Sequence, residues 1–368
     1  MNIKLGDLCK IQAGGTPSRN ISKYWENGDI PWVKIGDIES KFLNKTTEFI
    51  TKEGLNNSSA KMIEKGSILY TIFATLGEVC ITNIDVTTNQ AIAGLTLRDD
   101  KVDLEYLYYF LKSLHLHVNS IGRGVAQNNI NLTILREFSV PVPNRKKQLE
   151  IANILKVIEN IIESRKKQIQ EYDQLIKSRF VEMFGNPIKN DKEWKLKFLD
   201  EVCDVRDGTH DSPKYYNVGY PLITSKNISN GNIDYSTAQL ICEEDYQNIN
   251  KRSKVDNGDI LMPMIGTVGG AIIVRKERDF AIKNVALIKF NTKLVENTFI
   301  KYVLNSDQMN LHFEDLKKGG TQKFIGLKTI RNLPIIVPPI KLQSQFATFV
   351  QQVDKLKFEV LKLLRELR

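Results

Sequence analysis

Histidines and glycine-rich stretches are the first residues of this chain to consider for catalysis, metal binding or phosphate binding. His115 and His117 stand two residues apart on a predicted helix, where positions i and i+2 do not share a face, so their spacing suits a metal ion poorly. His210 stands beside Asp211, a pairing typical of acid–base chemistry, but no nucleophile accompanies it. The sequence contains no Gly-x-x-x-x-Gly-Lys phosphate loop, no Rossmann glycine spacing, no Asn-Pro-Pro-Tyr motif and no nuclease carboxylate cluster. We therefore expect no catalytic residues, no metal and no cofactor on this chain.

Charge and composition indicate the class of partner. The formal net charge of +9 and the pI near 9.1 favour a polyanion, most simply nucleic acid, although a merely basic surface is the alternative. No apolar run of membrane-spanning length exists, and residues 1–7 lack the apolar core of a signal peptide. The four scattered cysteines indicate reduced structural thiols. These features predict a cytoplasmic protein with no membrane contact.

Polar loops flanked by aromatic residues are the candidate DNA contacts. Arg can grip guanine bidentately and Asn or Gln can grip adenine, whereas Lys mostly meets phosphates. In the first half of the chain the candidates are Thr16, Ser18, Arg19, Lys23, Tyr24, Arg123, Gln127, Asn128 and Asn129. In the second half they are Thr209, His210, Lys214, Tyr215, Lys226, Asn227, Lys317, Lys318, Thr321, Gln322 and Lys323. An ordinary solvated turn is the alternative interpretation of each loop.

One long helix must organise the elements that carry these loops. Between Pro143 and Gly185 there is no interior Gly or Pro, and apolar residues recur with a 3.5–3.6 period. The predicted rows are Ile151, Ile158, Tyr172 and Arg179; Ile154, Ile161 and Leu175; and Leu155, Ile162, Ile169 and Ile176. Such a helix is roughly 55–60 Å long, so part of it should stand between globules.

A second helix repeats this pattern from Leu342 to Arg368, again after a proline stop. Its rows are Phe346, Val353, Val360 and Leu367, and Phe349, Leu356 and Leu363. Each helix needs an apolar partner, and the other is available. We therefore predict that the two helices pair as a coiled coil.

An internal repeat divides the chain into matching halves. Residues 331–338, Arg-Asn-Leu-Pro-Ile-Ile-Val-Pro, match residues 136–143, Arg-Glu-Phe-Ser-Val-Pro-Val-Pro, at a shift of 195 (331 − 136). The same shift carries Gln148 onto Gln343, and Gly66 meets Gly258 at a shift of 192 (258 − 66). Drifting shifts are what loop insertions produce in a duplicated sequence.

The repeat predicts the domain organisation. We expect globules at residues 1–142 and 190–338, a central helix at 143–185 and a C-terminal helix at 339–368. Strand-like runs at 68–72, 91–95, 260–264 and 285–288, with helices at 104–116 and 297–305, indicate mixed α/β globules. The predicted fold class is α+β: two similar mixed α/β domains separated by two long antiparallel helices in a pseudo-twofold arrangement.

Short motifs open each half of the repeat and lead to a family resemblance. Leu-Gly-Asp-Leu stands at 5–8, Phe-Leu-Asp-Glu-Val at 198–202 and Asp-Gly-Thr-His at 207–210. In each half a proline-terminated strand leads through Lys-Gln or Leu-Gln into a long helix. In these features, and along its whole length, the sequence resembles the specificity subunit of type I restriction–modification enzymes.

The resemblance implies a non-catalytic DNA-binding subunit. It implies two target-recognition domains, each reading one half of a bipartite double-stranded DNA target, with a spacer set by helix length. It implies two methyltransferase subunits and two motor–nuclease (restriction) subunits as partners, with S-adenosylmethionine, ATP and magnesium on those partners only. The C-terminal helix, which ends at Arg368, departs from the pattern because it is shorter than the central one.

Two other classes of function remain open at this point. A protein-binding scaffold, with two globules on a coiled coil and incidental charge, fits the same repeat. An enzyme with an unrecognised site fits less well, since no nucleophile, metal set or cofactor loop recurs in both halves.

Overall fold

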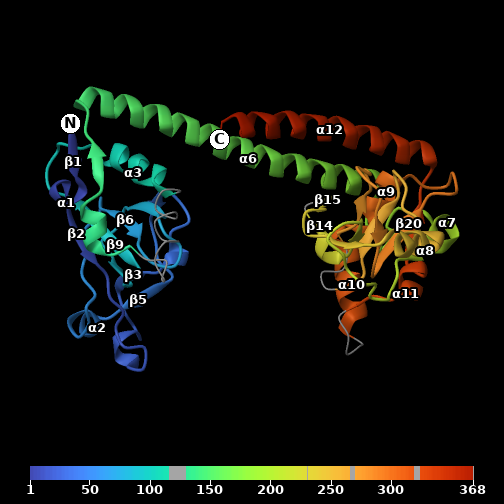
Figure 1. Ribbon diagram of the computed structural model, residues 1–368, viewed down its shortest axis with the longest axis horizontal. Coiled ribbons are helices and arrows are strands. Elements are labelled where there is room, and N and C mark those ends of the chain that lie inside the picture. The colour runs from blue at the N-terminus through green and yellow to red at the C-terminus, as the bar shows by residue number, and fades with distance from the viewer. Residues whose placement is uncertain (116–129, 230, 266–269, 319–323, 368) are drawn as a thin grey trace. The chain divides into compact units, whose positions relative to one another are not determined.

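The protein divides into two units, each with its own core. The computed structural model describes residues 1–115, 130–229, 231–265, 270–318 and 324–367. Unit 1 covers residues 1–162 and unit 2 covers residues 163–368, so the division falls inside the long helix α6 (Arg145–Phe184; Figure 1). Buried side chains of unit 1 cluster between Leu5 and Ala152, and the main core of unit 2 lies between Ile176 and Val353. Within the described ranges, no helix combines the length and apolar character that a membrane span needs.

Unit 1 is built around a five-stranded sheet. In spatial order its strands are β2 (Cys9–Ala13), β9 (Ile92–Leu97), β6 (Ile68–Thr71), β7 (Val79–Thr82) and β4 (Phe42–Leu43), antiparallel except for the β4–β7 pair. A second sheet has the order β5 (Glu48–Ile50), β3 (Ile30–Val33), β8 (Thr87–Thr88), and β1 (Asn2–Lys4) pairs with β10 (Ser139–Pro141). The helices are α1 (Leu5–Leu8), α2 (Lys52–Asn56), α3 (Leu104–Ser113) and α5 (Leu132–Arg136), with 3-10 turns η1 (Ser22–Tyr24) and η2 (Ile35–Asp37). All four residues of β6 are buried, as expected for a central strand covered on both faces.

Unit 2 repeats this arrangement. Its larger sheet has the order β12 (Asp204–Asp207), β20 (Val285–Lys289), β17 (Ile260–Pro263), β18 (Ile272–Ile273). A second sheet has the order β16 (Gln239–Ile241), β13 (Tyr220–Ile223), β19 (Ala281–Ile282), and two pairs join β11 (Lys195–Phe198) to β21 (Pro334–Val337) and β14 (Ile228–Ser229) to β15 (Asn232–Ile233). The helices are α7 (Leu199–Val202), α8 (Glu243–Ser253), α9 (Asn297–Leu304), α10 (Asp307–Lys318), α11 (Leu327–Arg331) and α12 (Ile340–Glu366), with the 3-10 turn η3 (Ser225–Asn227).

The shared topology confirms the predicted duplication. The strand order β2-β9-β6-β7 of unit 1 corresponds to β12-β20-β17-β18 of unit 2. The order β5-β3-β8 likewise corresponds to β16-β13-β19, and in both sheets one pair is antiparallel and the other parallel. The four strands and two helices predicted from the sequence are β6, β9, β17, β20, α3 and α9. The mixed α/β fold class expected from the repeat is therefore confirmed.

Buried cysteines fit the expected structural role. Cys9, Cys80 and Cys203 are buried and free, and burial raises the pKa of each thiol to about 12. Each therefore stays protonated near neutral pH and packs as a small apolar side chain.

A buried glutamine fastens the start of each long helix to its unit. Gln148 (1% exposed) and Gln343 (0% exposed) each accept one backbone N–H and donate to two backbone carbonyls. The bonds join Gln148 to Asp103 N (2.7 Å), Lys101 O (3.0 Å) and Pro143 O (2.9 Å), and Gln343 to Glu296 N (2.9 Å), Leu294 O (3.0 Å) and Pro338 O (2.8 Å). The two glutamines matched in the sequence repeat thus make the same clamp in both units.

Substitution of the clamp should destabilise its unit. Gln343→Leu leaves one N–H and two carbonyls without a partner, so we expect the free energy of unfolding to fall by about 2–4 kcal/mol. Urea denaturation followed by circular dichroism measures this loss. Gln352→Leu makes the same change at an exposed position of α12 and should shift stability by less than about 0.5 kcal/mol. Equal effects of the two substitutions would show that the clamp contributes nothing.

Helices α6 and α12 pair within unit 2 and run antiparallel. The ring of Phe346 on α12 lies 5.5 Å from the rings of Phe180 and Phe184 on α6, centroid to centroid. Towards the other end of α12, Lys357 forms an ion pair with Asp173. The contact on α6 is thus at Asp173, before Phe180, while the contact on α12 is at Lys357, after Phe346, so the two helices run in opposite directions. Figure 1 shows them side by side. This confirms the predicted pairing.

Part of the predicted apolar seam is wrong. Ile154, Ile161 and Leu175 of α6 are 52%, 41% and 47% exposed, and Leu356, Leu363 and Leu367 near the end of the chain are 50%, 44% and 39% exposed. The predicted rows are right at Ile176, Phe346, Val353 and Val360, which are buried, and they missed the buried side chains of Phe180, Phe184 and Val350. Within unit 2 the reason is that α6 and α12 turn one stripe towards the sheet-bearing core as well as towards each other.

Candidate nucleic-acid interface

In unit 1, two glycines set the direction of the first candidate loop at the end of β2. Gly15 donates its N–H to Thr88 O (2.8 Å), and a Cβ at this position would lie 2.2 Å from Ser59 Oγ. Only glycine fits so close an approach, which forces the chain outwards into residues 16–25. Thr16, which follows, donates its hydroxyl to Gln90 Oε1 at 2.5 Å.

Arg19 is the most constrained candidate in this loop. Its Cζ lies 3.6 Å from the ring centroid of Trp25 and 4.8 Å from that of Trp32, a cation–π arrangement. Its Nη1 lies 2.5 Å from Glu48 Oε2, while Lys34 Nζ lies 2.8 Å from Glu48 Oε1. Hydrogen bonds from Lys34 and then from Arg19 hold the pKa of Glu48 below its usual value. The guanidinium is thus oriented before any ligand arrives, while half of the side chain stays exposed.

The neighbouring candidates differ in accessibility. Ser18 is exposed, and its carbonyl accepts a hydrogen bond from Trp25 Nε1 (3.1 Å). Lys23 is exposed and forms an ion pair with Glu53. Tyr24 is buried, at 9% exposure, so its ring stabilises the loop by packing and is not open to a ligand.

Unit 2 places Gly208 and Thr209 where unit 1 places Gly14 and Gly15. Gly208 donates to Val285 O (3.1 Å) and Thr209 donates to Ile282 O (3.0 Å), as Gly14 donates to Ile92 O (3.2 Å) and Gly15 to Thr88 O. A Cβ at Gly208 would lie 2.2 Å from Ile282 O. The next residue, His210, therefore takes the position of Thr16, and it bonds Asn284 as Thr16 bonds Gln90.

His210 contacts one group that is near in sequence and one that is distant. Its Nδ1 lies 2.7 Å from Asn284 Oδ1, and its Nε2 lies 2.8 Å from Asp207 Oδ2. Asp207 is buried, and Arg252 of α8 pairs with its other oxygen. The hydrogen bonds to Asn284 and then to Asp207 raise the pKa of His210 above 6.5. The adjacent Asp211 donates its backbone N–H to Thr209 Oγ1 (3.1 Å). The carboxylate beside His210 is therefore that of Asp207, and not that of Asp211 as the sequence suggested.

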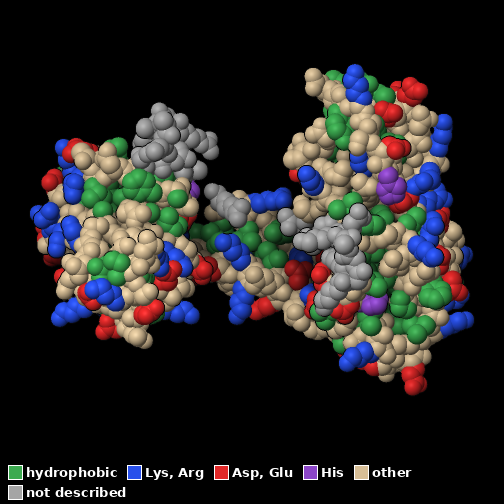
Figure 2. Space-filling model, turned by 90° about the horizontal axis from the view of Figure 1, so that it is seen from below, with side chains coloured by type: hydrophobic (Ala, Val, Ile, Leu, Met, Phe, Trp, Pro, Cys, Tyr) green, Lys and Arg blue, Asp and Glu red, His purple; other side chains and the backbone are tan. Residues whose placement is uncertain are grey.

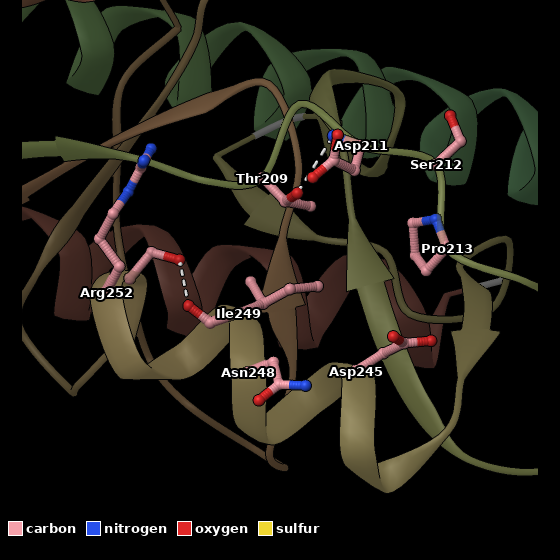
Figure 3. A pocket seen from close by; sticks show the side chains of 9 residues that line it. Thr209, Asp211, Ser212, Pro213, Asp245, Asn248, Ile249 and Arg252 are labelled. Carbon is pink, nitrogen blue, oxygen red and sulfur yellow. Dashed lines mark hydrogen bonds between the residues drawn. The ribbon is translucent and has the colours of Figure 1, made fainter.

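A polar pocket of about 330 Å³ lies between this loop and helix α8 (Figure 3). The loop contributes Thr209, Asp211, Ser212 and Pro213, and α8 contributes Asp245, Asn248, Ile249, Arg252 and Ser253. Figure 3 shows Thr209 and Asp211 joined by a hydrogen bond on the loop, and Arg252 at one end of the pocket. Beyond the pocket, Lys214 and Tyr215 are exposed, and Lys214 Nζ lies 5.7 Å from the ring centroid of Tyr216.

The third candidate patch of unit 2 combines one exposed and one buried residue. Lys226 is exposed. Asn227 is 4% exposed, and its Oδ1 accepts from the backbone N–H (3.0 Å) and hydroxyl (2.9 Å) of Thr224. In unit 1, Asp37 accepts from Lys34 N (2.9 Å) at the corresponding turn. The Asn227 side chain therefore shapes its turn.

Several candidates fall outside the described residues. These are Arg123, Gln127, Asn128, Asn129, Thr321, Gln322 and Lys323, together with His117. Lys317 and Lys318 end α10, and their side chains are also outside the description. Within the ranges that are described, no three His, Cys, Asp or Glu side chains group as a metal site requires.

The structure adds four basic residues that the loop patterns did not indicate: Arg206, Lys251, Arg252 and Arg331. They line a cleft beside His210 with a volume of about 680 Å³. Only Arg331 carried a signal in the sequence, since the repeat matches it to Arg136. On the face seen in Figure 2, Lys and Arg side chains are spread over both units among Asp and Glu, so net charge alone did not mark this cleft.

Comparison with known proteins identifies the family. The family model described as "Type I restriction modification DNA specificity domain" matches residues 1–172 and 191–367. A relative from Methanocaldococcus jannaschii, the type I restriction enzyme MjaIX specificity subunit, is 26% identical over 95% of this chain and 85% of its own length. The type I restriction enzyme EcoR124I/EcoR124II specificity subunit of Escherichia coli is 27% identical over 47% of this chain and 46% of its own length.

Solved structures agree with the fold. A chain from a structure that concerns complex assembly and conformational transition of the type I R-M system covers 100% of this chain and 94% of its own length, with a TM-score of 0.65 at 18% identity. The type I restriction–modification S subunit from M. genitalium covers 100% of this chain and 92% of its own length, with a TM-score of 0.54 at 16% identity. A family model that matches both repeats, on a fold that is itself duplicated, leads to one conclusion. The chain belongs to the type I restriction–modification DNA specificity family, and it is the DNA target-recognition subunit of such a system, whose catalytic activities reside on other subunits.

Proposed function

We propose that each unit of this specificity subunit reads one half of a bipartite DNA target. The observation that carries the proposal is the duplicated loop at the ends of β2 and β12, which has the same backbone hydrogen bonds in both units and different side chains. Thr16 and Arg19 occupy the loop in unit 1, whereas His210 and Lys214 occupy it in unit 2. Two similar supports with unlike contact residues suit two unlike half-sites.

In this proposal the exposed lysines and arginines fix position and the polar loop residues choose bases. Lys23, Lys214 and Lys226 meet phosphates, which gives affinity that depends on salt but not on sequence. Arg19 is held by its tryptophans in one orientation, as bidentate recognition of a guanine edge requires. Tyr24 and Asn227, which are buried, act by holding their loops in shape.

Partner subunits carry out the chemistry in the proposal. Two methyltransferase subunits, which flip the target adenine, and two motor–nuclease subunits assemble on this chain in the cytoplasm. S-adenosylmethionine, ATP and magnesium belong to those partners. The exposed faces of the helices supply the docking surface, and Leu356, Phe358 and Leu361 of α12 are 50%, 61% and 41% exposed. Lys166, Lys167 and Lys355 are exposed on these faces, whereas the Lys357 side chain is 20% exposed and forms an ion pair with Asp173.

The salt dependence of DNA binding tests this function against the scaffold alternative. If the full chain neutralises several phosphates, its affinity for duplex DNA should fall about a thousandfold or more between about 50 and 200 mM salt. Gel-shift titration at several salt concentrations measures the slope. Binding that is absent or insensitive to salt would favour the scaffold. If binding depends steeply on salt, methylome sequencing of a host that carries this chain with its partners would identify the target.

A further inference from the structure

We propose that the cleft beside His210 in unit 2 binds a backbone phosphate of the DNA and that protonated His210 contributes to its positive charge. The cleft is lined by Asp204, Arg206, Asp207, His210, Lys251, Arg252, Leu327 and Arg331. Four permanent cations thus face two carboxylates. The inference rests on the proposed function and names a site that the family assignment does not supply.

Internal hydrogen bonds hold two of the cations in place. Arg206 uses all three nitrogens: Nε and Nη2 contact Asp204 Oδ2 at 2.9 and 2.5 Å, and Nη1 donates to the Arg252 carbonyl at 3.0 Å. Arg331 donates Nε and Nη2 to Val205 O at 3.0 and 2.8 Å. Arg206 is therefore held at the side of the cleft by all of its nitrogens. Arg331 is held by Val205 O, and its Nη1 is not used in these bonds.

The unused donors indicate the ligand. Lys251 makes one side-chain bond, from Nζ to Asn248 Oδ1 at 2.9 Å, and it is exposed. Arg252 spends Nη2 on Asp207, which leaves Nε and Nη1. Among the described residues no acceptor is recorded for these groups or for Arg331 Nη1. N–H donors with a positive charge, already ordered around an open cleft, suit an oxyanion.

The contacts of His210 explain why it carries charge. Its Nδ1 faces Asn284 Oδ1, between β19 and β20, and its Nε2 faces Asp207 Oδ2 on β12. A carboxylate oxygen and an amide oxygen both accept hydrogen bonds, so this arrangement favours the imidazolium, the form in which both ring nitrogens carry a proton. The other charged groups around it are Arg252 on α8, which lowers its pKa, and the cleft residues Lys251, Arg206, Arg331 and Asp204.

The pH dependence follows from the raised pKa of His210. A raised pKa means that the folded chain holds this proton more tightly than a free imidazole, whose pKa is about 6.5. The charge and the link from loop 208–213 to Asn284 are therefore present below about pH 6.5 and are lost as the pH rises through the raised value. DNA affinity should weaken in that direction.

Unit 1 has different residues at the positions that correspond to this cleft. The repeat aligns Gln12, Ala13 and Thr16 with Arg206, Asp207 and His210, and only Arg136 keeps the charge of Arg331. Gln12 is also engaged, because its Nε2 donates to Met62 O at 2.6 Å. The inferred phosphate contact and its pH dependence thus belong to one half-site only.

The test uses the full chain and a fluorescent duplex that contains its target, with affinity measured by anisotropy over a range of salt and pH. Lys251→Gln should weaken binding about three- to tenfold and lower the slope of log Kd against log salt by about 0.9, the value for one lost phosphate contact. Lys189→Gln removes the same charge from an exposed side chain elsewhere in unit 2 and should leave the slope unchanged. Equal slopes for the two variants would overturn the inference. A wild-type chain without salt-dependent binding would instead overturn the proposed function.

Two further measurements locate the contact. Wild-type affinity should fall several-fold as the pH rises from about 6 to about 8.5, and His210→Gln should flatten that change, since glutamine does not titrate. Neutral methylphosphonates placed one at a time along the DNA should reveal a position in one half-site where the modification and Lys251→Gln together weaken binding no more than either alone. Full additivity at every position, or a pH profile unaffected by His210→Gln, would contradict the inference.

Discussion

Replacing residues 1–142 with the matching domain of another family member is expected to change one half of the methylated sequence and to leave the other half unchanged. The reason is that the two units have separate cores, with buried clusters between Leu5 and Ala152 and between Ile176 and Val353. Because a specific site is preferred about a thousandfold or more over other DNA, the change should be complete at the level of detected sites. Methylome sequencing with the partner subunits measures it.

The reciprocal exchange is the matched control. Replacing residues 190–338 should change the other half of the target and preserve the first. Gln148 and Gln343 lie outside the exchanged ranges and stay in the chain, so each donor domain must keep the turn whose backbone N–H and carbonyl these glutamines bond. If either exchange altered both halves, or neither, the assignment of one half-site to each unit would be wrong.

Phe346→Ala is expected to cause the largest loss of stability. The side chain is fully buried, and its ring lies 5.5 Å from those of Phe180 and Phe184 and 5.2 Å from that of Tyr302. Removing a buried phenylalanine ring typically costs about 3–5 kcal/mol, because the cavity collapses only partly. Since the ring joins α12 to α6 and to the core of unit 2, hydrogen exchange of the α12 and β17 amides should accelerate about a hundredfold or more.

Phe358→Ala provides the comparison on the same helix. Phe358 is 61% exposed, so its truncation should change stability by less than about 0.5 kcal/mol and leave the exchange rates nearly unchanged. Similar exchange in the two variants would mean that packing at Phe346 does not hold the helices together. A loss of partner binding in Phe358→Ala, with stability intact, would support the proposed docking surface on α12.

Helix ends and the duplication could be predicted because they depend on local chemistry. The stretch from Pro143 to Gly185 became a helix from Arg145 to Phe184, since proline disfavours helical geometry at the residue before it and Gly185 adopts a φ of +75° at the end of the helix. The seam was harder to predict. Period alone does not say which stripe of a long helix faces a partner, so Leu175 was expected inside and is 47% exposed, whereas Phe184 is fully buried.

The candidate site, too, could be predicted only in part. Glycine and polar residues located the loops after β2 and β12, because glycine is needed where backbones approach closely. The charged cleft did not follow from those patterns. Arg252 reaches Asp207 across 45 residues and His210 reaches Asn284 across 74, and no short motif records such distances.

The sequence by itself determined that this protein has two similar sheet-bearing units, each leading into a long helix, because repeats, prolines and apolar periods act over short stretches of chain. Only the tertiary structure decided which polar side chains are buried supports, as Tyr24 and Asn227 are, and which remain exposed to a ligand. It also decided that His210 contacts Asn284, which is 74 residues away. The physical reason is that burial and hydrogen bonding depend on neighbours brought together by folding, and those neighbours lie far away along the chain.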